Sequence, residues 1–421
     1  MITLWYLMWQ GLQPGRTLES VLTDARRGGA DRLCPKGKRL SNGLKSKATT
    51  AYSNARQRLP LEWVRQCFAQ LAEVLLSLRQ SPSQELRVEL LDGSTKRLRP
   101  HGSIPQSFPP HRSNRKKPYW CLARVLVSFC ALSGIATVAL IASNHCSEQA
   151  MAVELILQAA KAVLYVGDRN FGVWRVVGAA VQGGGHALVR LTTVRARRLA
   201  GRKRLPSFLD QAVVWSASSH DQVDPGLINK PVSGRLIIIK ARRRGYRPQT
   251  LYLFTTLLDQ QVYPPQRLLE LYGCRWQVEL NYRTIKSTMQ MDQSEAKSAD
   301  MVSKEFYAGL MAYNLVRGLM TAAAQQSGCR PVDISFTKVQ GLLAAVLAEL
   351  FLASMSPSVG DSRLSWLFDQ AAGARLPRRH KPRRNEPRAQ YYEPQIFPKI
   401  KGSRAEARAA LEKLKKTHAK S

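Results

Sequence analysis

Short apolar stretches with strand-like spacing dominate the chain between residues 86 and 192. One of them alternates apolar and polar residues, and the others are almost continuously apolar, as in strands buried on both faces. Two stretches with helical spacing lie among them, and the first begins on a capping serine. The predicted strands are Leu86–Leu91, 120–132, 135–142, Val163–Gly167 and His186–Thr192, and the predicted helices are Ser147–Ala162 and Val173–Gln182.

This order of elements predicts an α/β fold class, with an antiparallel meander of three strands followed by strands added through helices. Residues 195–250 interrupt the rhythm as a basic, β-rich insertion, with strands expected around Val213–Trp215 and Leu236–Lys240. A buried strand pattern returns at Leu251–Leu258. A helix is then expected to begin near Pro265 and to continue through Lys286, since no proline occurs from Gln266 onward in that stretch.

The flanking regions look different from this core. Residues 1–45 contain glycine, proline and arginine throughout and are expected to be irregular, before a helix at Leu61–Arg79. Beyond the core, helices are expected at 306–325, 336–353 and 403–416, and a Pro-Arg tract at 374–388 is expected to be extended or disordered. We therefore divide the chain into an N-terminal irregular and helical region, a catalytic core containing the insertion, and a C-terminal helical region with a basic tail. The boundaries are 1–84, 85–300 (insertion 195–250) and 301–421.

Cys121 to Ala142 is long enough and apolar enough to raise the alternative of an integral membrane protein. Arg124 interrupts this stretch, and Ser133-Gly134 marks a turn near its middle. Val, Ile, Phe and Thr are common in it, as they are in strands. Two adjacent buried strands fit this pattern better, so we expect no membrane partner.

Charge narrows the function more than length does. The 421 residues include 64 Lys+Arg against 29 Asp+Glu, a net charge of +35. Such an excess is expected of a protein that binds a polyanion over a long footprint, although a ribosomal or nonspecific nucleic-acid binder would also fit. The seven cysteines are scattered and include no Cys-x-x-Cys pair, which favours reduced thiols in an intracellular compartment and gives no sign of a zinc site.

One predicted helix carries a polar face of unusual composition. At about 100° per residue, Tyr272, Arg275, Glu279 and Lys286 fall within a sector of roughly 60°, and Arg283 joins the same face. An aromatic hydroxyl, several cations and one carboxylate do not build an apolar core. The alternative is a solvated face on which the glutamate pairs with arginines three or four residues away.

Two aspartates stand at predicted strand ends and supply partners for that glutamate. Asp92 follows the first strand, and Asp168 follows the fourth. If those strands are neighbours, both aspartates meet at one edge of the sheet and the helix of Glu279 can lie across it. Three oxygen ligands without histidine or cysteine suit Mg²⁺ or Mn²⁺, and two such ions are a known solution to phosphodiester chemistry. Singly, each aspartate also fits an ordinary turn or a loop ion pair.

At these residues the chain resembles the IS-four group of bacterial insertion-sequence transposases. The resemblance rests on the spacing Tyr-x₂-Arg-x₃-Glu-x₆-Lys and on two aspartates in the contexts LLDGST and VGDRNF, and runs from about residue 50 to the C-terminus. It implies the catalytic and metal-binding residues Asp92, Asp168 and Glu279, and the phosphate-binding residues Tyr272, Arg275 and Lys286.

The resemblance also implies a ribonuclease-H-like core with the β-rich insertion placed before the glutamate helix. It implies a cytoplasmic, nucleoid-associated DDE enzyme that uses two Mg²⁺ or Mn²⁺ ions for cut-and-paste DNA transposition through a DNA hairpin. The partners would be transposon terminal inverted repeats and target DNA, with a homodimer in the synaptic complex. Trp215 in the insertion and Trp276 beside Arg275 are candidates for stacking on a base, although packing would explain either one.

A second function from another class stays open at this point. The chain could be a catalytically inactive copy that acts only as a DNA-binding regulator of transposon ends. Metal-dependent nicking of an end-containing duplex would distinguish the enzyme from such a regulator.

Overall fold

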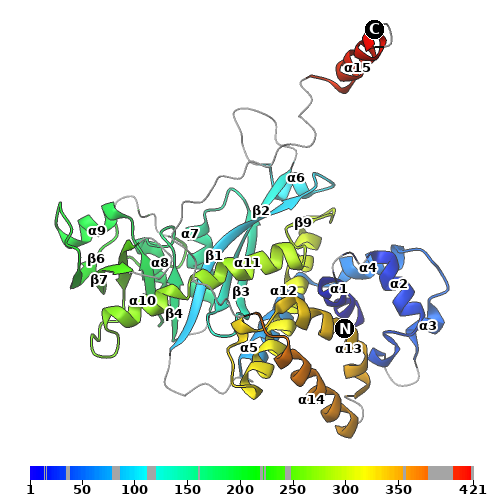
Figure 1. The fold of residues 1–421 in the computed structure, drawn as a ribbon, viewed down its shortest axis with the longest axis horizontal. Coiled ribbons are helices and arrows are strands. Elements are labelled where there is room, and N and C mark those ends of the chain that lie inside the picture. Colours follow the sequence, from blue (N-terminus) through cyan, green and yellow to red (C-terminus); the bar gives the residue numbers. More distant parts are fainter. Residues whose placement is uncertain are drawn as a thin grey trace. The chain divides into compact units, whose positions relative to one another are not determined.

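The computed structural model describes residues 1–13, 15, 17–34, 38–77, 86–110, 120–159, 162–218, 221, 224–241, 248–353, 357–377 and 402–418. In these residues a nine-stranded mixed sheet forms the centre, with the order β3-β2-β1-β4-β5-β8-β7-β6 and β9 beside β1 (Figure 1). The strands are β1 (Arg87–Leu98), β2 (Cys121–Cys130), β3 (Ala136–Ser143), β4 (Val163–Gly167), β5 (His186–Arg190), β6 (Leu209–Trp215), β7 (Val232–Ala241), β8 (Gln249–Thr255) and β9 (Gln293–Ser294).

The pairing of the strands confirms the predicted meander and its extension. β1, β2 and β3 are antiparallel, and β4 and β5 are added in parallel next to β1. The first and fourth strands are therefore neighbours. The insertion strands β6 and β7, together with β8, continue the same sheet as an antiparallel group beyond β5. The insertion thus shares the backbone hydrogen bonds of the core.

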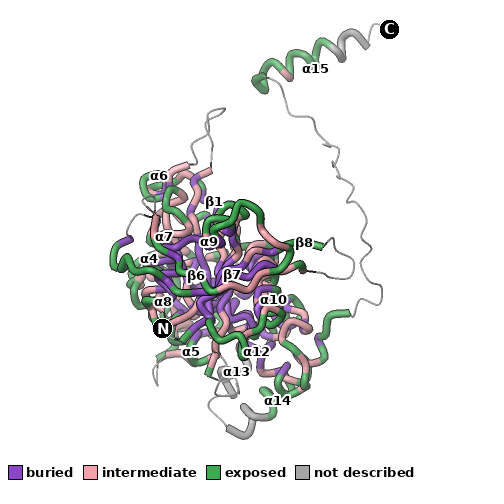
Figure 2. Tube along the Cα trace, turned by 90° about the vertical axis from the view of Figure 1, so that its left-hand side faces the viewer, coloured by how far each residue is buried: buried purple, intermediate pink, exposed green. Residues whose placement is uncertain are grey.

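Helices cover both faces of the sheet, which explains its uninterrupted apolar strands. Leu90 of β1 belongs to the apolar cluster on one face and Leu91 to the cluster on the other, because side chains alternate along a strand. Figure 2 shows buried residues gathered in the interior, around the sheet. Helices α7 (Glu148–Gln158), α8 (Trp174–Gln182) and α9 (Thr193–Ala200) contribute to the cluster of Leu91.

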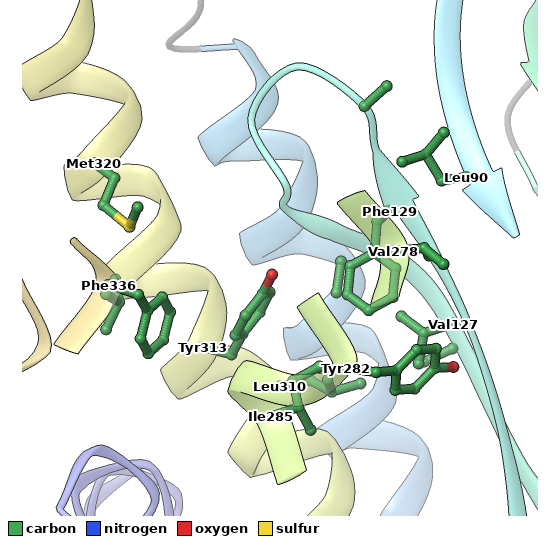
Figure 3. Packing of buried hydrophobic residues seen from close by; sticks show 14 of the residues in the cluster. Leu90, Val127, Phe129, Val278, Tyr282, Ile285, Leu310, Tyr313, Met320 and Phe336 are labelled. Carbon is green, nitrogen blue, oxygen red and sulfur yellow. The ribbon is translucent and has the colours of Figure 1, made fainter. Parts of the chain in front are cut away.

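The cluster of Leu90 is the larger one and extends far from the sheet. In Figure 3, Phe129 of β2 lies near Tyr282 and Val278, and Tyr313 lies between this group and Phe336. The helices in it are α1 (Ile2–Leu12), α5 (Leu61–Ser77), α10 (Pro265–Gly273), α11 (Trp276–Arg283), α12 (Ala299–Gln326), α13 (Phe336–Ala353) and α14 (Pro357–Gly373).

The N-terminal region differs from the expectation of irregular structure in residues 1–45. It contains α1, α2 (Leu18–Arg26) and the short α3 (Leu40–Gly43), followed by α4 (Thr50–Arg58). Leu4, Leu7 and Leu12 of α1 are buried in the large cluster, where α1 contacts α12. The apolar residues of α1 thus find their partner more than 280 residues later in the chain. The spacing of apolar residues within residues 1–45 could therefore not reveal that α1 packs on α12.

β1 is twice as long as predicted and does not end at Asp92. It continues through Asp92-Gly93 to Leu98, paired with β2 throughout, so the expected strand end before Asp92 and the alternative of a turn there are both wrong. Its second half is polar. In this half the ammonium group of Lys96 donates to the carbonyls of Met291 and Gln293, at 2.7 and 3.0 Å. A polar strand of this kind has no hydrophobic signature.

Two compact units account for the chain: residues 1–242 with 248–380, and residues 243–247 with 381–421. In the second unit the described residues include α15 (Arg404–His418), close to the predicted helix 403–416. The predicted Pro-Arg tract lies mostly outside the described residues. Cys121–Ala142 forms β2 and β3, as expected. Among the helices in the described residues, none combines the length and the apolar character required to cross a membrane.

Candidate active site

Asp92 and Asp168 lie next to each other where β4 ends. In the parallel pair of strands Leu90 faces Val166, and each aspartate follows one of these residues by two positions. Leu90 and Val166 both pack in the large apolar cluster. Because side chains alternate, Asp92 lies on that same face, which α10 and α11 cover. The predicted meeting of the two aspartates therefore follows from the strand register.

The electrostatics of Asp92 agree with this proximity. Burial raises the pKa of the Asp92 carboxyl to about 6, and the negative charges of Asp168 and Glu148 act in the same direction. The backbone N–H of Gly93, which donates to Asp92 Oδ1 at 2.9 Å, and the charge of Arg275 oppose the rise. A half-buried carboxylate with two negative neighbours is a place that favours a positive charge.

The polar face of the predicted helix is carried by two helices rather than one. α10 begins at Pro265, as predicted, but the helix is interrupted at Cys274 and Arg275 before α11. At the interruption the backbone N–H groups of Arg275 and Val278 donate to carbonyls three residues earlier. Thr284–Thr288 is a π-helical turn. The helix is thus wound tightly before Glu279 and loosely around Lys286, and such irregular turns are frequent at functional sites.

Arg275 connects Glu279 with the aspartates. Its Nη2 donates to Glu279 Oε1 at 2.8 Å, and its charge also acts on Asp92. A solvated helix face would form the same ion pair between Arg275 and Glu279. Here, however, Arg275 also interacts with the charge of Asp92, so the ion pair lies close to the aspartates. Across the described ranges, no set of three or more His, Cys, Asp or Glu side chains is assembled as a metal site. The structure therefore brings two of the three predicted carboxylates together and holds the third through Arg275.

Tyr272 is buried, with 7% of its surface exposed. Burial raises the pKa of its hydroxyl, opposed by the charges of the nearby Arg275 and Arg190. Asp168 is close enough to contribute as well. Tyr272 thus packs under the cations of the site, whereas Arg283, which shares its predicted face, is exposed to solvent.

Lys286 lies toward the far half of β1. Burial lowers the pKa of its ammonium group, opposed by the charges of Asp292 and Asp92. Lys286 is partly buried and lines an open pocket of about 470 Å³. The other residues around this pocket are Thr95, Arg97, Ser287, Gln290 and Asp292.

The two candidate stacking tryptophans have opposite environments. Trp215 is 9% exposed, and its ring packs edge-on against Phe254 at 4.9 Å between centroids. A ring in this position would have to leave the core to stack on a base. Trp276, at the start of α11 beside Arg275, is 49% exposed. Only Trp276 is available to a ligand in the described conformation.

We expect Trp215→Ala and Trp276→Ala to have different effects. Trp215→Ala should lower the free energy of unfolding by about 3–5 kcal/mol, because it empties a packed site. Trp276→Ala should change stability by less than about 0.5 kcal/mol, as exposed substitutions usually do. Urea denaturation of both variants measures the difference, and equal losses of stability would contradict these assignments.

Several residues that surround the aspartates were not predicted from the sequence. Glu148 and Asn170 lie next to them, and Arg190 lies near Tyr272. The hydroxyl of Tyr282 donates to the carbonyl of Asp92 at 2.7 Å and ties α11 to β1. None of these residues belongs to a pattern that marks a site, and Glu148 reads as an ordinary first-turn acid of a helix. The one available signal was Gly93, a glycine inside what proves to be a strand.

Three comparisons with known proteins each find similar proteins. The profile of the family described as "Transposase DDE domain" matches residues 83–315, more than half of the chain. The chain is 26% identical over 311 residues to the transposase InsG for insertion sequence element IS4 of Escherichia coli strain K12, covering 73% of this chain and 69% of that protein. A cryo-EM structure of the piggyBac transposase synaptic complex with hairpin DNA covers 88% of this chain and 75% of that chain, with a TM-score of 0.41 and 10% identity.

Proposed function

The chain belongs to the transposase DDE-domain family, and on that premise we propose that it excises and inserts an insertion sequence by cutting and joining DNA. The steps would be metal-dependent hydrolysis of a phosphodiester, attack by the freed 3′-hydroxyl to give a DNA hairpin, reopening, and strand transfer into target DNA. The catalytic core would be ribonuclease-H-like, in keeping with the mixed sheet flanked by helices.

The observation that carries the proposal is the juxtaposition of Asp92 and Asp168 under the helix of Arg275 and Glu279. The juxtaposition of the two aspartates does not stabilise the fold, since a half-buried pair of like charges costs folding energy. Such an arrangement is expected where charge serves a ligand. The ligand that a DNA-cutting enzyme needs at this point is a cation.

The donor set fits a divalent ion. Proteins of this family generally use divalent metal ions, and carboxylate oxygens without nitrogen or sulfur ligands suit Mg²⁺ or Mn²⁺. Asp92 and Asp168 would hold two ions jointly, and Glu279 would complete the set. When bound, such ions activate the attacking oxygen and stabilise the leaving oxygen. In the structure Glu279 is paired with Arg275.

The cations of the helix would hold the DNA strand. Arg275 offers a forked donor and Lys286 a point charge, the two ways in which proteins bind phosphate. Lys286 lines the open pocket beside β1 and is therefore reachable by a phosphate. Tyr272 is buried too deeply to bind a DNA phosphate directly, so its role would be to orient the side chains of Arg190 and Arg275.

The net charge supports a long DNA footprint, as terminal inverted repeats and target DNA would require. Helix α9 and the residues after it add a row of exposed cations close to Asp168, since Arg195 donates to the carbonyl of Arg169 at 3.4 Å. In the synaptic complex we expect a homodimer that brings two transposon ends together. The exposed cations of this row are Arg197, Arg198, Arg202, Lys203 and Arg204.

A cleavage assay tests the proposal. The purified protein is incubated with a duplex that carries the terminal inverted repeat of its element, with Mg²⁺, Mn²⁺ or EDTA. We expect nicked and hairpin products with either metal and none with EDTA. Asp168→Ala should bind the duplex as the wild type does, yet give no product, because it removes a carboxylate that would help to hold the ions.

Binding without cleavage in both metals would refute the enzyme and favour the regulator of transposon ends. The ion pair that holds Glu279, and the lack of a three-ligand cluster among the described residues, are the observations that keep the regulator in consideration. The assay therefore decides between two functions that predict the same DNA-binding behaviour.

A further inference from the structure

Glu148 is a third carboxylate beside the aspartate pair, and nothing in the proposed chemistry uses it. It is the first residue of α7, where Ser147 accepts the N–H of Ala150 at 3.0 Å as the helix cap. Its side chain is 24% exposed, and Arg124 lies 3.7 Å away. Its charge acts on Asp92 across the sheet. α7 is on the opposite face from α11, so the site is bounded by both layers.

The glycine after Asp92 leaves room for this side chain. A Cβ atom built on Gly93 would lie 2.6 Å from Glu148 Cδ and 2.7 Å from its Oε1, closer than any real contact. Gly93 is paired with Leu126 in the middle of β1 and β2, so no turn explains a glycine there. Any larger residue would push Glu148 away from the strand. A close approach of a side chain to the backbone is a recognised reason for glycine inside a strand.

Glu148 is connected to Asp168 through Asn170. Its Oε2 accepts a hydrogen bond from Asn170 Nδ2 at 2.6 Å. The backbone N–H of Asn170 in turn donates to Asp168 Oδ1 at 2.7 Å. Gln149, the next residue of α7, donates to the carbonyl of Asn170 at 2.9 Å. The loop that follows β4 is therefore held by two consecutive side chains of α7.

We propose that Glu148, acting through Asn170, is the positioning residue that fixes the carboxylate of Asp168 against Asp92. Without the contact to Glu148, Asn170 would keep only its hydrogen bonds to Gln149 on α7, and its N–H would no longer hold Asp168 in one orientation. The proposal assigns to Glu148 a hydrogen-bond acceptor role rather than a role as a ligand. It rests on the proposed function, because the orientation of Asp168 matters for cation binding and cleavage.

The test compares four single variants and one double variant in the cleavage assay. Glu148→Ala and Asn170→Ala should each slow cleavage about tenfold, the value expected from losing a hydrogen bond to a charged group. Glu148→Gln keeps an acceptor oxygen of the same reach, so it should stay within about threefold of the wild type. The double variant Glu148→Ala/Asn170→Ala should be no slower than either single variant. Glu154→Ala, on an exposed position of the same helix, is the matched control.

A second measurement does not depend on cleavage. Mn²⁺ should raise the melting temperature of the wild type, Glu148→Gln and Glu154→Ala by similar amounts, and that of Glu148→Ala and Asn170→Ala by less than half as much. Equal Mn²⁺ shifts in all proteins, a Gln variant as slow as the Ala variant, or effects that multiply in the double variant would overturn the inference. A wild type that neither cleaves nor responds to Mn²⁺ would instead refute the proposed function itself.

Discussion

Asp92→Asn is expected to lower DNA cleavage by about 10³-fold while making the folded protein more stable at neutral pH. The loss of activity would follow from removing a charged ligand of the proposed metal ions, whose stabilisation of the transition state is worth several kcal/mol. The amide is nearly isosteric, and its oxygen can still accept the N–H of Gly93. The fold around Asp92 should therefore survive.

The gain in stability has a definite sign and pH range. The folded-state pKa of Asp92 is about 6, above the ordinary value of 3.8. Between these two values the folded protein binds more protons than the unfolded chain, so its stability falls as pH rises. Above pH 6 the full cost is present, about 3 kcal/mol at most. Asp92→Asn removes that cost, whereas below pH 4 the variant and the wild type should be equally stable.

Urea denaturation at pH 4, 5, 6 and 7.5 measures the stability, and the cleavage assay measures the activity. Asp369→Asn, at an exposed position of α14, is the control and should change neither quantity. A variant of Asp92 that cleaves within tenfold of the wild type would remove Asp92 from the catalytic set. A variant that is less stable than the wild type at pH 7.5 would contradict the electrostatic account.

Arg235→Met is expected to destabilise the protein by about 3–5 kcal/mol, because it leaves an uncompensated charge inside the fold. Arg235 of β7 is 1% exposed and binds Asp210 of β6 with both Nε and Nη2, at 3.0 and 2.6 Å. Its Nη1 donates to the carbonyls of Leu257 and Tyr263, at 3.2 and 2.9 Å. Methionine fills similar space but satisfies none of these acceptors.

The same substitution should also reduce cleavage, since the residues that Arg235 holds lead directly into α10. Arg235→Met/Asp210→Leu should recover part of the lost stability, because the orphaned carboxylate is then gone. Arg202→Met, at an exposed position, is the matched control for loss of an arginine. Chemical denaturation of the three variants measures the effects. A loss below about 1 kcal/mol for Arg235→Met would mean that the network contributes little.

The sequence alone determined the elements whose evidence is local. Strands β2 to β5 were found because burial on both faces forces continuous apolar runs, and α7 because Ser147 caps it. The start of α10 at Pro265 has the same kind of cause. The pairing of Asp92 with Asp168 could be predicted as a condition on strand order, and the observed neighbours β1 and β4 meet it. The roles of Asp92, Asp168 and Glu279 in catalysis stay predictions.

Only the tertiary structure decided the features that depend on distant partners. α1 is a helix that packs on α12. The polar half of β1 is a strand because it pairs with β2 and because its Lys96 donates to a carbonyl beyond Lys286. Trp215 is a core residue because Phe254 lies opposite. Glu279 is held by Arg275, and Glu148 enters the site over Gly93. The physical reason is common to all of them: a side chain's environment is set by whatever the fold places against it, and local periodicity records only whether that environment is apolar.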